Sequence, residues 1–279
     1  MPVNFRKFSR RDLAAAHRLS LGVNWPHRLE DWDLVQRLGS GYVAEDGDEI
    51  VGTVLGWKHD RHNASLGMVI VAARLQGRGI GRKLMTLALA DLDARAVSLN
   101  ATPAGQPLYE ALGFEAIDAV QQHQGNVGRV PIVGLAHGER LRPVGASDGP
   151  KLAALAARAS GMSRRRVIAK LLDVGKGIVL TRGGEPIGFA LLRRFGRGHA
   201  IGPVVAPDLP RAKVLIGHWA AMHQGKFVRI DVPASSGLGE WLDGIGLAKV
   251  DTVITMASGA PSRKDPRMRV FALVNQALG

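Results

Sequence analysis

Residues 76–81 read Gln76-Gly77-Arg78-Gly79-Ile80-Gly81 and come shortly after the apolar run Met-Val-Ile-Val at 68–71. The segment that follows, 82–93, has the apolar spacing of an amphipathic helix. Glycine leaves the backbone open to a ligand and tolerates positive φ angles, and the first turn of a helix adds unpaired N–H donors and a positive dipole end. A glycine-rich turn between a strand and a helix is therefore predicted to cradle a phosphate-bearing ligand.

Two other phosphate-binding motifs do not fit this loop. A dinucleotide-binding fold needs G-x-G-x-x-G early in a βαβ unit and an acidic residue about 20 positions later. A P-loop needs G-K-[ST], whereas Gly81 is followed by Arg82 and Lys83. Taken alone, the loop is also compatible with an ordinary glycine-rich turn.

A second motif lies downstream, at Leu108-Tyr109-Glu110-Ala111-Leu112-Gly113-Phe114. Together the two motifs resemble the GNAT superfamily of N-acetyltransferases, in which Q/R-x-x-G-x-G/A holds the pyrophosphate of acetyl-CoA and L-Y-x-x-L-G-F carries a tyrosine beside the thioester. The resemblance implies transfer of an acetyl group from acetyl-CoA to a primary amine by direct attack. It also implies that Tyr109 is the general acid for the CoA thiolate.

The resemblance further implies which residues hold acetyl-CoA. They are the fourth strand and the glycine loop, namely Val69, Ile70, Val71, Gln76, Gly77, Arg78, Gly79, Ile80, Gly81 and Arg82. Arg78, Arg82 and Lys83 would neutralise phosphate groups, although a solvated helix face explains them as well. Many family members carry an asparagine before the tyrosine helix. This chain has Ala104-Gly105-Gln106-Pro107 there, and Asn100 is assigned to the pantetheine arm instead.

The acceptor is expected to be a small-molecule or peptide amine, which must be neutral to attack. A lysine-like amine with a pKa of about 10.4 needs a base, and an α-amino group with a pKa of about 8 hardly does. Candidate bases are Glu30, Glu45, His59 and Asp60, and for each of them a solvated surface role is the alternative that the residue type favours. The cluster Trp25, His27, Glu30 and Trp32 is a candidate acceptor pocket, with core packing as the alternative for the tryptophans.

Basic and acidic residues are unevenly distributed between the two halves of the chain. Residues 1–139 hold 15 Lys and Arg against 15 Asp and Glu, which leaves 22 of the 37 basic residues against 9 of the 24 acidic ones for 140–279. The chain has no cysteine, no 18-residue apolar run and no secretory-signal pattern at its start. We expect a cytoplasmic protein, monomeric or homodimeric, with no membrane partner and no metal site.

The resemblance implies an α+β fold, a three-layer αβα arrangement with a mixed, mostly antiparallel sheet, and we expect it to be built twice as two tandem GNAT-like domains at 1–137 and 138–279. In the first domain we expect strands at 3–8, 42–45, 50–58, 66–71, 96–101, 114–120 and 128–135. Helices are expected from the capping box Ser9-x-x-Asp12 onward and at 30–38, 82–93 and 104–112.

The second half repeats this pattern at an offset of about 130–136 residues. Glu185-Pro186-Ile187-Gly188 matches Glu49-Ile50-Val51-Gly52, and 241–247 matches the tyrosine helix, with Leu242 or a neighbour at the tyrosine position. The segment matching the glycine loop, 208–213, contains no glycine. The second domain is therefore expected to be degenerate and not to bind acetyl-CoA.

A different class of function is the alternative. The sequence pI of about 10.8 and the run Arg164-Arg165-Arg166 would suit a basic nucleic-acid- or partner-binding protein that uses a non-catalytic GNAT-like scaffold. Aromatic residues make up only 5% of the chain, and it has no zinc or RNA-binding motif.

Overall fold

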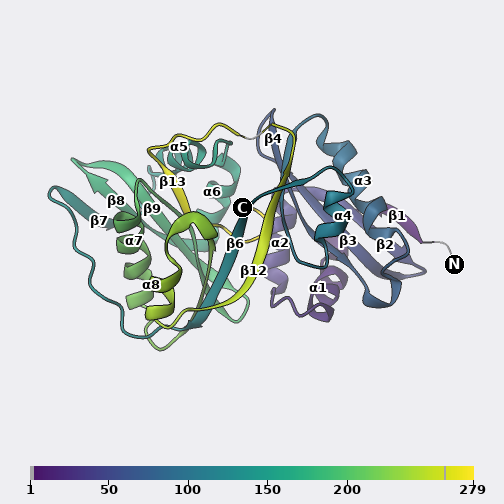
Figure 1. Ribbon diagram of the computed structural model, residues 1–279, viewed down its shortest axis with the longest axis horizontal. Coiled ribbons are helices and arrows are strands. Elements are labelled where there is room, and N and C mark those ends of the chain that lie inside the picture. Colours follow the sequence, from purple (N-terminus) through teal and green to yellow (C-terminus); the bar gives the residue numbers. More distant parts are fainter. Residues whose placement is uncertain (1–2, 261) are drawn as a thin grey trace.

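The structure is a computed structural model that describes residues 3–260 and 262–279 (Figure 1). The first half of the chain contains β1 (Asn4–Lys7), α1 (Leu13–Gly22), α2 (Leu29–Leu38), β2 (Ser40–Asp46), β3 (Glu49–Lys58), β4 (Asn63–Val71), α3 (Ile80–Leu92), β5 (Ala96–Ala101), α4 (Gln106–Glu110) and β6 (Glu115–Asn126). Three short 3-10 helices, η1 (Arg10–Asp12), η2 (Ala73–Leu75) and η3 (Ala234–Ser236), lie between longer elements.

The second half repeats this order. Its elements are β7 (Glu139–Pro143), α5 (Gly149–Ser160), α6 (Arg165–Val174), β8 (Gly175–Arg182), β9 (Glu185–Phe195), β10 (Gly198–Ala206), α7 (Leu209–Ala221), β11 (Phe227–Pro233), α8 (Gly239–Gly244), β12 (Ala248–Ser258) and an extra strand β13 (Arg269–Ala272). The repeat predicted from the sequence is confirmed element by element up to β12.

Local signals in the sequence place several of these elements. The side chains of Ser9 and Asp12 form the expected capping box ahead of α1. Two of the expected first-domain elements differ. The predicted strand at 128–135 is wrong, because these residues form no strand or helix, and the expected helix 104–112 is limited to α4. The missing strand is replaced from the other half of the chain.

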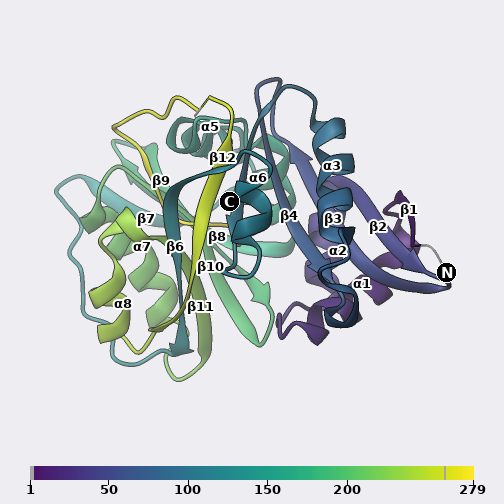
Figure 2. The same cartoon turned by 45° about the vertical axis from the view of Figure 1, so that its right-hand side comes forward.

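All the strands join one sheet, in the order β1-β2-β3-β4-β5-β12-β6-β11-β10-β9-β8-β7, with β13 paired to β10. Among the described strands, only β4–β5 and β10–β11 are parallel pairs. Starting from either edge, the sheet first contains the five leading strands of one half, β1–β5 or β7–β11. Next comes the sixth strand of the other half, and then the sixth strand of the same half. β6 and β12 lie side by side at the centre of Figures 1 and 2, each inserted into the sheet of the other half.

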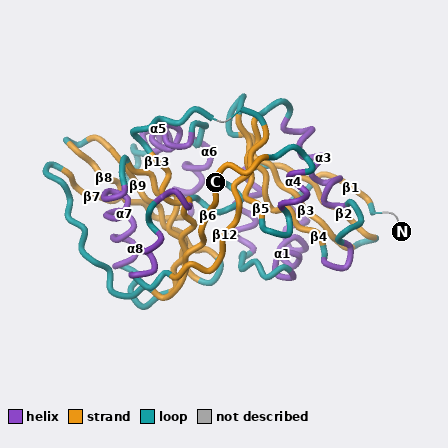
Figure 3. Tube along the Cα trace, viewed as in Figure 1, coloured by secondary structure: helices purple, strands orange, loops and turns teal. Residues whose placement is uncertain are grey.

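Helices cover both faces of this sheet, which gives the predicted three layers (Figure 3). The face that carries α3 and α4 has one hydrophobic core in the first half, and the face that carries α7 and α8 has another in the second. The third core is shared, because α1 and α2 pack with α5 and α6 around residues such as Trp32, Leu152 and Ile168. Both the sheet and this core therefore run through both halves.

A buried ion pair crosses the shared core. Asp31 in α2 is 2% exposed, and its carboxylate lies 3.2 Å from the Arg193 guanidinium of β9. It also accepts hydrogen bonds from the backbone N–H groups of Arg28 (2.9 Å) and Gly196 (3.1 Å). Burial lowers the pKa of Arg193 to about 10, so its guanidinium stays charged at neutral pH and needs this partner.

Within the described residues, no helix is both long enough and apolar enough to cross a membrane.

Removing Asp31 should destabilise the whole chain. In Asp31→Ala the Arg193 charge stays buried without its acid, which costs about 3–5 kcal/mol of unfolding free energy. The matched control is Asp33→Ala on the same helix. The ion pair between Asp33 and Arg37 is half exposed, so its loss should lower the unfolding free energy by less than about 1 kcal/mol. Urea unfolding at pH 7 measures both, and equal losses would contradict a special role for Asp31.

The Asp31 contribution should also depend on pH. Burial works to raise the pKa of Asp31, but hydrogen bonds from Arg28 and Gly196 and the charge of Arg193 outweigh it and lower the pKa below its usual value. The stabilisation is therefore present above the unfolded-state pKa of about 3.9 and is lost as the pH falls through the folded-state pKa. The stability difference between wild type and Asp31→Asn should thus shrink when unfolding is measured at about pH 3 instead of pH 7. A constant difference would show that ionised Asp31 is not the stabilising form.

Candidate active site

The fourth and fifth strands separate where the predicted cofactor site begins. β4 and β5 pair only from Asn63 to Ser65 against Ala96 to Ser98, and beyond this point they diverge. On its other edge β4 bulges, because the register with β3 shifts between Thr53 and Leu55. Met68 has a φ of +53° at this bulge, and its carbonyl accepts a 2.7 Å hydrogen bond from the Thr53 hydroxyl. The residues from 66 to 71 thus have backbone groups facing a gap instead of a fifth-strand partner.

The glycine loop lies at the open end of this gap, at the start of α3. Gly77 and Gly79 have φ angles of +77° and +79°, and a Cβ on either one would meet no atom within 4 Å. At Gly81 the neighbours leave little space for a side chain, because a Cβ there would lie 3.3 Å from Leu108 and 3.7 Å from Val71. The loop therefore presents an open backbone surface next to the helix N-terminus, which fits a diphosphate.

The side chains around this loop face solvent. Gln76 is exposed and donates a 3.1 Å hydrogen bond to the carbonyl of Val71, which ties the loop to the end of β4. Arg78, Arg82 and Lys83 are exposed as well, whereas Ile80 is buried in the core under α3. Val69 and Val71 are half-buried and Ile70 is buried, and Ile70 is in register with Thr53 of β3.

Tyr109 lies in α4, in the core on the α3 face, and is 7% exposed. Its ring packs edge-on against Phe114 at a centroid distance of 6.2 Å, and the Gly105 backbone leaves room for the phenol. Burial raises the pKa of Tyr109 to about 12. The hydroxyl therefore keeps its proton at neutral pH and is a hydrogen-bond donor.

Asn100 turns away from the glycine loop. Its amide donates a 2.7 Å hydrogen bond to the carbonyl of Gln276 and accepts one of 2.8 Å from the Thr255 hydroxyl. The side chain thus joins β5 to β12 and to the end of the chain. Its role toward pantetheine remains a prediction, and these contacts give it a structural role.

In the second half, the corresponding gap is filled by the chain itself. β10 and β11 pair only at His199 and Ala200 before they diverge, as β4 and β5 do. The strand β13 lies in this gap and pairs with β10 from Val204 to Ala206, and the N–H of Leu273 donates to the carbonyl of Asp231 on β11 at 2.8 Å. A Cβ on Gly202 would collide with the carbonyl oxygen of Leu273. β13 thus occupies the position in which the first half has open backbone groups.

The other parts of a cofactor site are also altered in the second half. The Asp208 side chain caps α7 by accepting a 3.0 Å hydrogen bond from the N–H of Arg211, which places a carboxylate where an anion would bind. Leu242 holds the position of Tyr109, because the N–H of Leu247 bonds to its carbonyl as that of Phe114 bonds to Tyr109. These features support the expected loss of acetyl-CoA binding.

The predicted acceptor cluster does not form one pocket. Trp32 is fully buried, stacks on Phe8 and donates to the Ser20 hydroxyl, so it has a packing role. Glu30 is exposed on α2. His27 packs edge-on against Phe195 of β9, and burial together with Arg229 lowers its pKa to about 4. Trp25 is half-buried and lies beside His27, so this segment is mainly a contact between the halves.

The other candidate bases, Glu45, Asp60 and His59, already have hydrogen-bond partners. Glu45 binds Arg6, and the Asp60 carboxylate accepts hydrogen bonds from the N–H groups of His62, Asn63 and Ser163. His59 lies 3.0 Å from the Ser65 hydroxyl, and burial together with the nearby Arg164 lowers its pKa to about 3. A histidine with this pKa is neutral but too weakly basic to hold a proton at pH 7. Within residues 3–260 and 262–279, no cluster of three His, Asp or Glu side chains could hold a metal ion.

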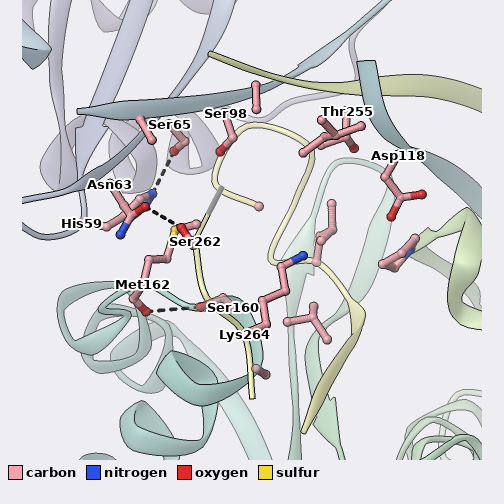
Figure 4. A pocket seen from close by; sticks show the side chains of 18 of the residues that line it. His59, Asn63, Ser65, Ser98, Asp118, Ser160, Met162, Thr255, Ser262 and Lys264 are labelled. Atoms are coloured by element: carbon pink, nitrogen blue, oxygen red, sulfur yellow. Dashed lines mark hydrogen bonds between the residues drawn. The ribbon is translucent and has the colours of Figure 1, made fainter. Parts of the chain in front are cut away.

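A cavity that the sequence did not predict lies between the halves (Figure 4). Its volume is about 480 Å³, and its walls include β4, β5, β12 and β6 on the sheet side. The other side is formed by the α5–α6 junction, residues 259–260 and 262–270, and the chain end. The polar side chains Ser65, Ser98, Thr255 and Asp118 line the sheet side. These residues are up to 190 positions apart, so no local motif could have identified them.

Comparisons with known proteins agree with this architecture. Two family models described as acetyltransferase (GNAT) domain match the chain, one over residues 25–128 and the other over residues 152–272. The uncharacterized N-acetyltransferase YitH of Bacillus subtilis (strain 168) is 29% identical over 271 residues, which cover 94% of this chain and 93% of that protein.

Solved structures share the fold across both halves. An acetyltransferase candidate from Pyrococcus horikoshii superimposes with a TM-score of 0.80 at 20% identity, covering 99% of this chain and 96% of that one. A tandem GNAT protein from the clavulanic acid biosynthesis pathway has a TM-score of 0.66 at 14% identity, covering 94% and 100%. With matching domain models in each half, the chain belongs to the GNAT superfamily of acetyltransferases and carries two GNAT domains in tandem.

Proposed function

We propose that this protein transfers the acetyl group of acetyl-CoA to a primary amine, and that the first half alone holds the cofactor. The observation that carries this proposal is the open gap between β4 and β5, which leads into the glycine loop at the start of α3. Acetyl-CoA supplies the activated thioester. Domain boundaries at 137/138 and a cytoplasmic location remain predictions.

The chain's own groups have distinct tasks in this proposal. Backbone groups of β4 from Val69 to Val71 hold the pantetheine arm as a neighbouring strand would. The backbone of the glycine loop and the α3 N-terminus bind the pyrophosphate, and the exposed Arg78 and Arg82 add positive charge. The occupied gap between β10 and β11 excludes a second cofactor molecule.

Tyr109 is assigned to the leaving thiolate as its general acid. A phenol with a pKa of about 12 holds its proton more tightly than a thiol with a pKa of about 8.5. It therefore stabilises the developing negative charge on sulfur chiefly by donating a hydrogen bond, and does not first lose its proton to solvent.

Substitution in the glycine loop should separate cofactor binding from backbone strain. Gly79→Ala places a methyl group on the open surface of the loop and strains a positive φ angle by about 1–2 kcal/mol. The matched control is Gly225→Ala, at a φ of +75° and with equally open surroundings in the second half. We expect similar losses of stability, with acetyl-CoA binding weakened at least about tenfold only in Gly79→Ala. Titration calorimetry measures this, and equal affinities would argue against the cradle.

The two tyrosines of the chain allow a matched test of the leaving-group role. Tyr109→Phe should lower kcat at least about tenfold and leave acetyl-CoA affinity within about twofold, because only the hydroxyl is lost. Tyr42→Phe, on β2 beneath the Lys7 ammonium, should change neither quantity. Unchanged turnover in Tyr109→Phe would show that the Tyr109 hydroxyl takes no part in the reaction.

A further inference from the structure

The cavity between the halves adjoins the strands that carry the proposed acetyl-CoA site. Ser65 on β4 and Ser98 on β5 are register partners and line it at the last point where these strands pair. Ala277 near the chain end packs over Gly67, one residue before the β4 bulge. An amine bound on this side of the sheet would therefore approach the gap between β4 and β5 from the face opposite α3.

The sheet wall of the cavity extends away from this gap. Asn100 of β5 pairs with Thr255 of β12, which pairs with Asp118 of β6. Neighbouring strands are about 4.8 Å apart, so the wall spans roughly 14 Å from β4 to β6. An acceptor could place its amine near the two serines and a second group farther along the wall.

The charged groups of the cavity come mainly from the second half, and among the described residues that line it three are basic and two are acidic. Two of its charged side chains are already engaged there: the buried Arg164 donates to the carbonyls of Leu278 and Gly279, and Asp265 binds Arg158 and Arg267. Asp118 accepts from its neighbour Ala119 and from Ser235.

The two other charged side chains that line the cavity are Lys264 and Arg269. Arg269 donates to the carbonyl of Ser235 and lies over the Phe271 ring. Among the described residues Lys264 makes no ion pair, and Figure 4 shows its ammonium group extending into the cavity. A free ammonium on the wall of a partly enclosed site is a recognition group for a negatively charged ligand.

We propose that this cavity is the acceptor site and that the acceptor is a small amine that also carries an anionic group, a carboxylate or a phosphate, bound by Lys264. The inference rests on the proposed function. The amine lies at Ser65 and Ser98 and the anion at Lys264, so the second half supplies acceptor recognition.

Matched acceptors test the substrate class. CoA thiol release is followed with L-leucine against isopentylamine, L-phenylalanine against phenethylamine, and O-phosphoethanolamine against ethanolamine. We expect kcat/KM to be at least about tenfold higher for the amine with an anionic group than for the partner that lacks this group. The first two pairs test a carboxylate and the third tests a phosphate. Equal or faster transfer to the amines without an anionic group would overturn the inference and leave the proposed function intact.

Replacing Lys264 with an uncharged residue tests whether its ammonium group binds the anion of the acceptor. Lys264→Met should raise KM for the preferred anionic amine at least about tenfold, with kcat and the acetyl-CoA affinity within about twofold, because the contact is remote from the reacting atoms. Lys249→Met, on the exposed start of β12, is the matched control and should change none of these values. An unchanged KM in Lys264→Met, with a melting temperature equal to wild type, would overturn the assignment. If acetyl-CoA binds but no amine in the panel is acetylated, the proposed function fails and the inference with it.

Discussion

The pairing of β6 with β12 is the constraint on which the rest of this structure depends. Each of these strands fills the gap between the fifth and sixth strands of the other half, so neither half can complete its sheet alone. An unfilled gap would leave the β5 and β11 edges with unsatisfied backbone groups. The shared core around Trp32 and Ile168 adds apolar burial to the same junction. The two domains therefore form one structural unit, although each repeats the same order of elements.

This symmetry explains why the second domain can lose its cofactor groove and still be retained. The sheet requires β12 and β11, whereas the gap between β10 and β11 only has to be filled by something that satisfies its backbone. β13 does this from within the chain, by pairing with β10 and contributing the Leu273 bond to β11. A carboxylate cap at Asp208 then replaces the glycine turn at no cost to the fold. Loss of one groove and retention of the scaffold are thus independent of each other.

The parts of the structure that depend on neighbouring residues were predictable from the sequence. The capping box at Ser9, the strand before the glycine loop and the helix after it follow from local pattern, and so does the repeat itself. The strand exchange was not predictable, because β5 finds its partner more than 150 residues away and a pattern of apolar residues does not say which strand it pairs with. The wrong strand at 128–135 arose from this, since a domain taken alone needs a seventh strand. The predictions for His27 and Asp60 failed for a related reason: His27 packs on Phe195 and Asp60 accepts a hydrogen bond from Ser163, both in the other half of the chain.

The uneven charge of the two halves gains a physical meaning in this arrangement. The whole excess of basic over acidic residues lies in the second half, and that half forms the wall opposite the sheet in the cavity between the halves. Lys264 and Arg269 are exposed, and salt screens such charges beyond about 10 Å, so their position beside the cavity matters more than the net charge of +13. A nucleic-acid surface would instead need basic side chains spread over an open face with stacking aromatics. Recognition of a small ligand therefore explains the basic residues that line the cavity. In this proposal catalysis is assigned to the first half and acceptor selectivity to the second.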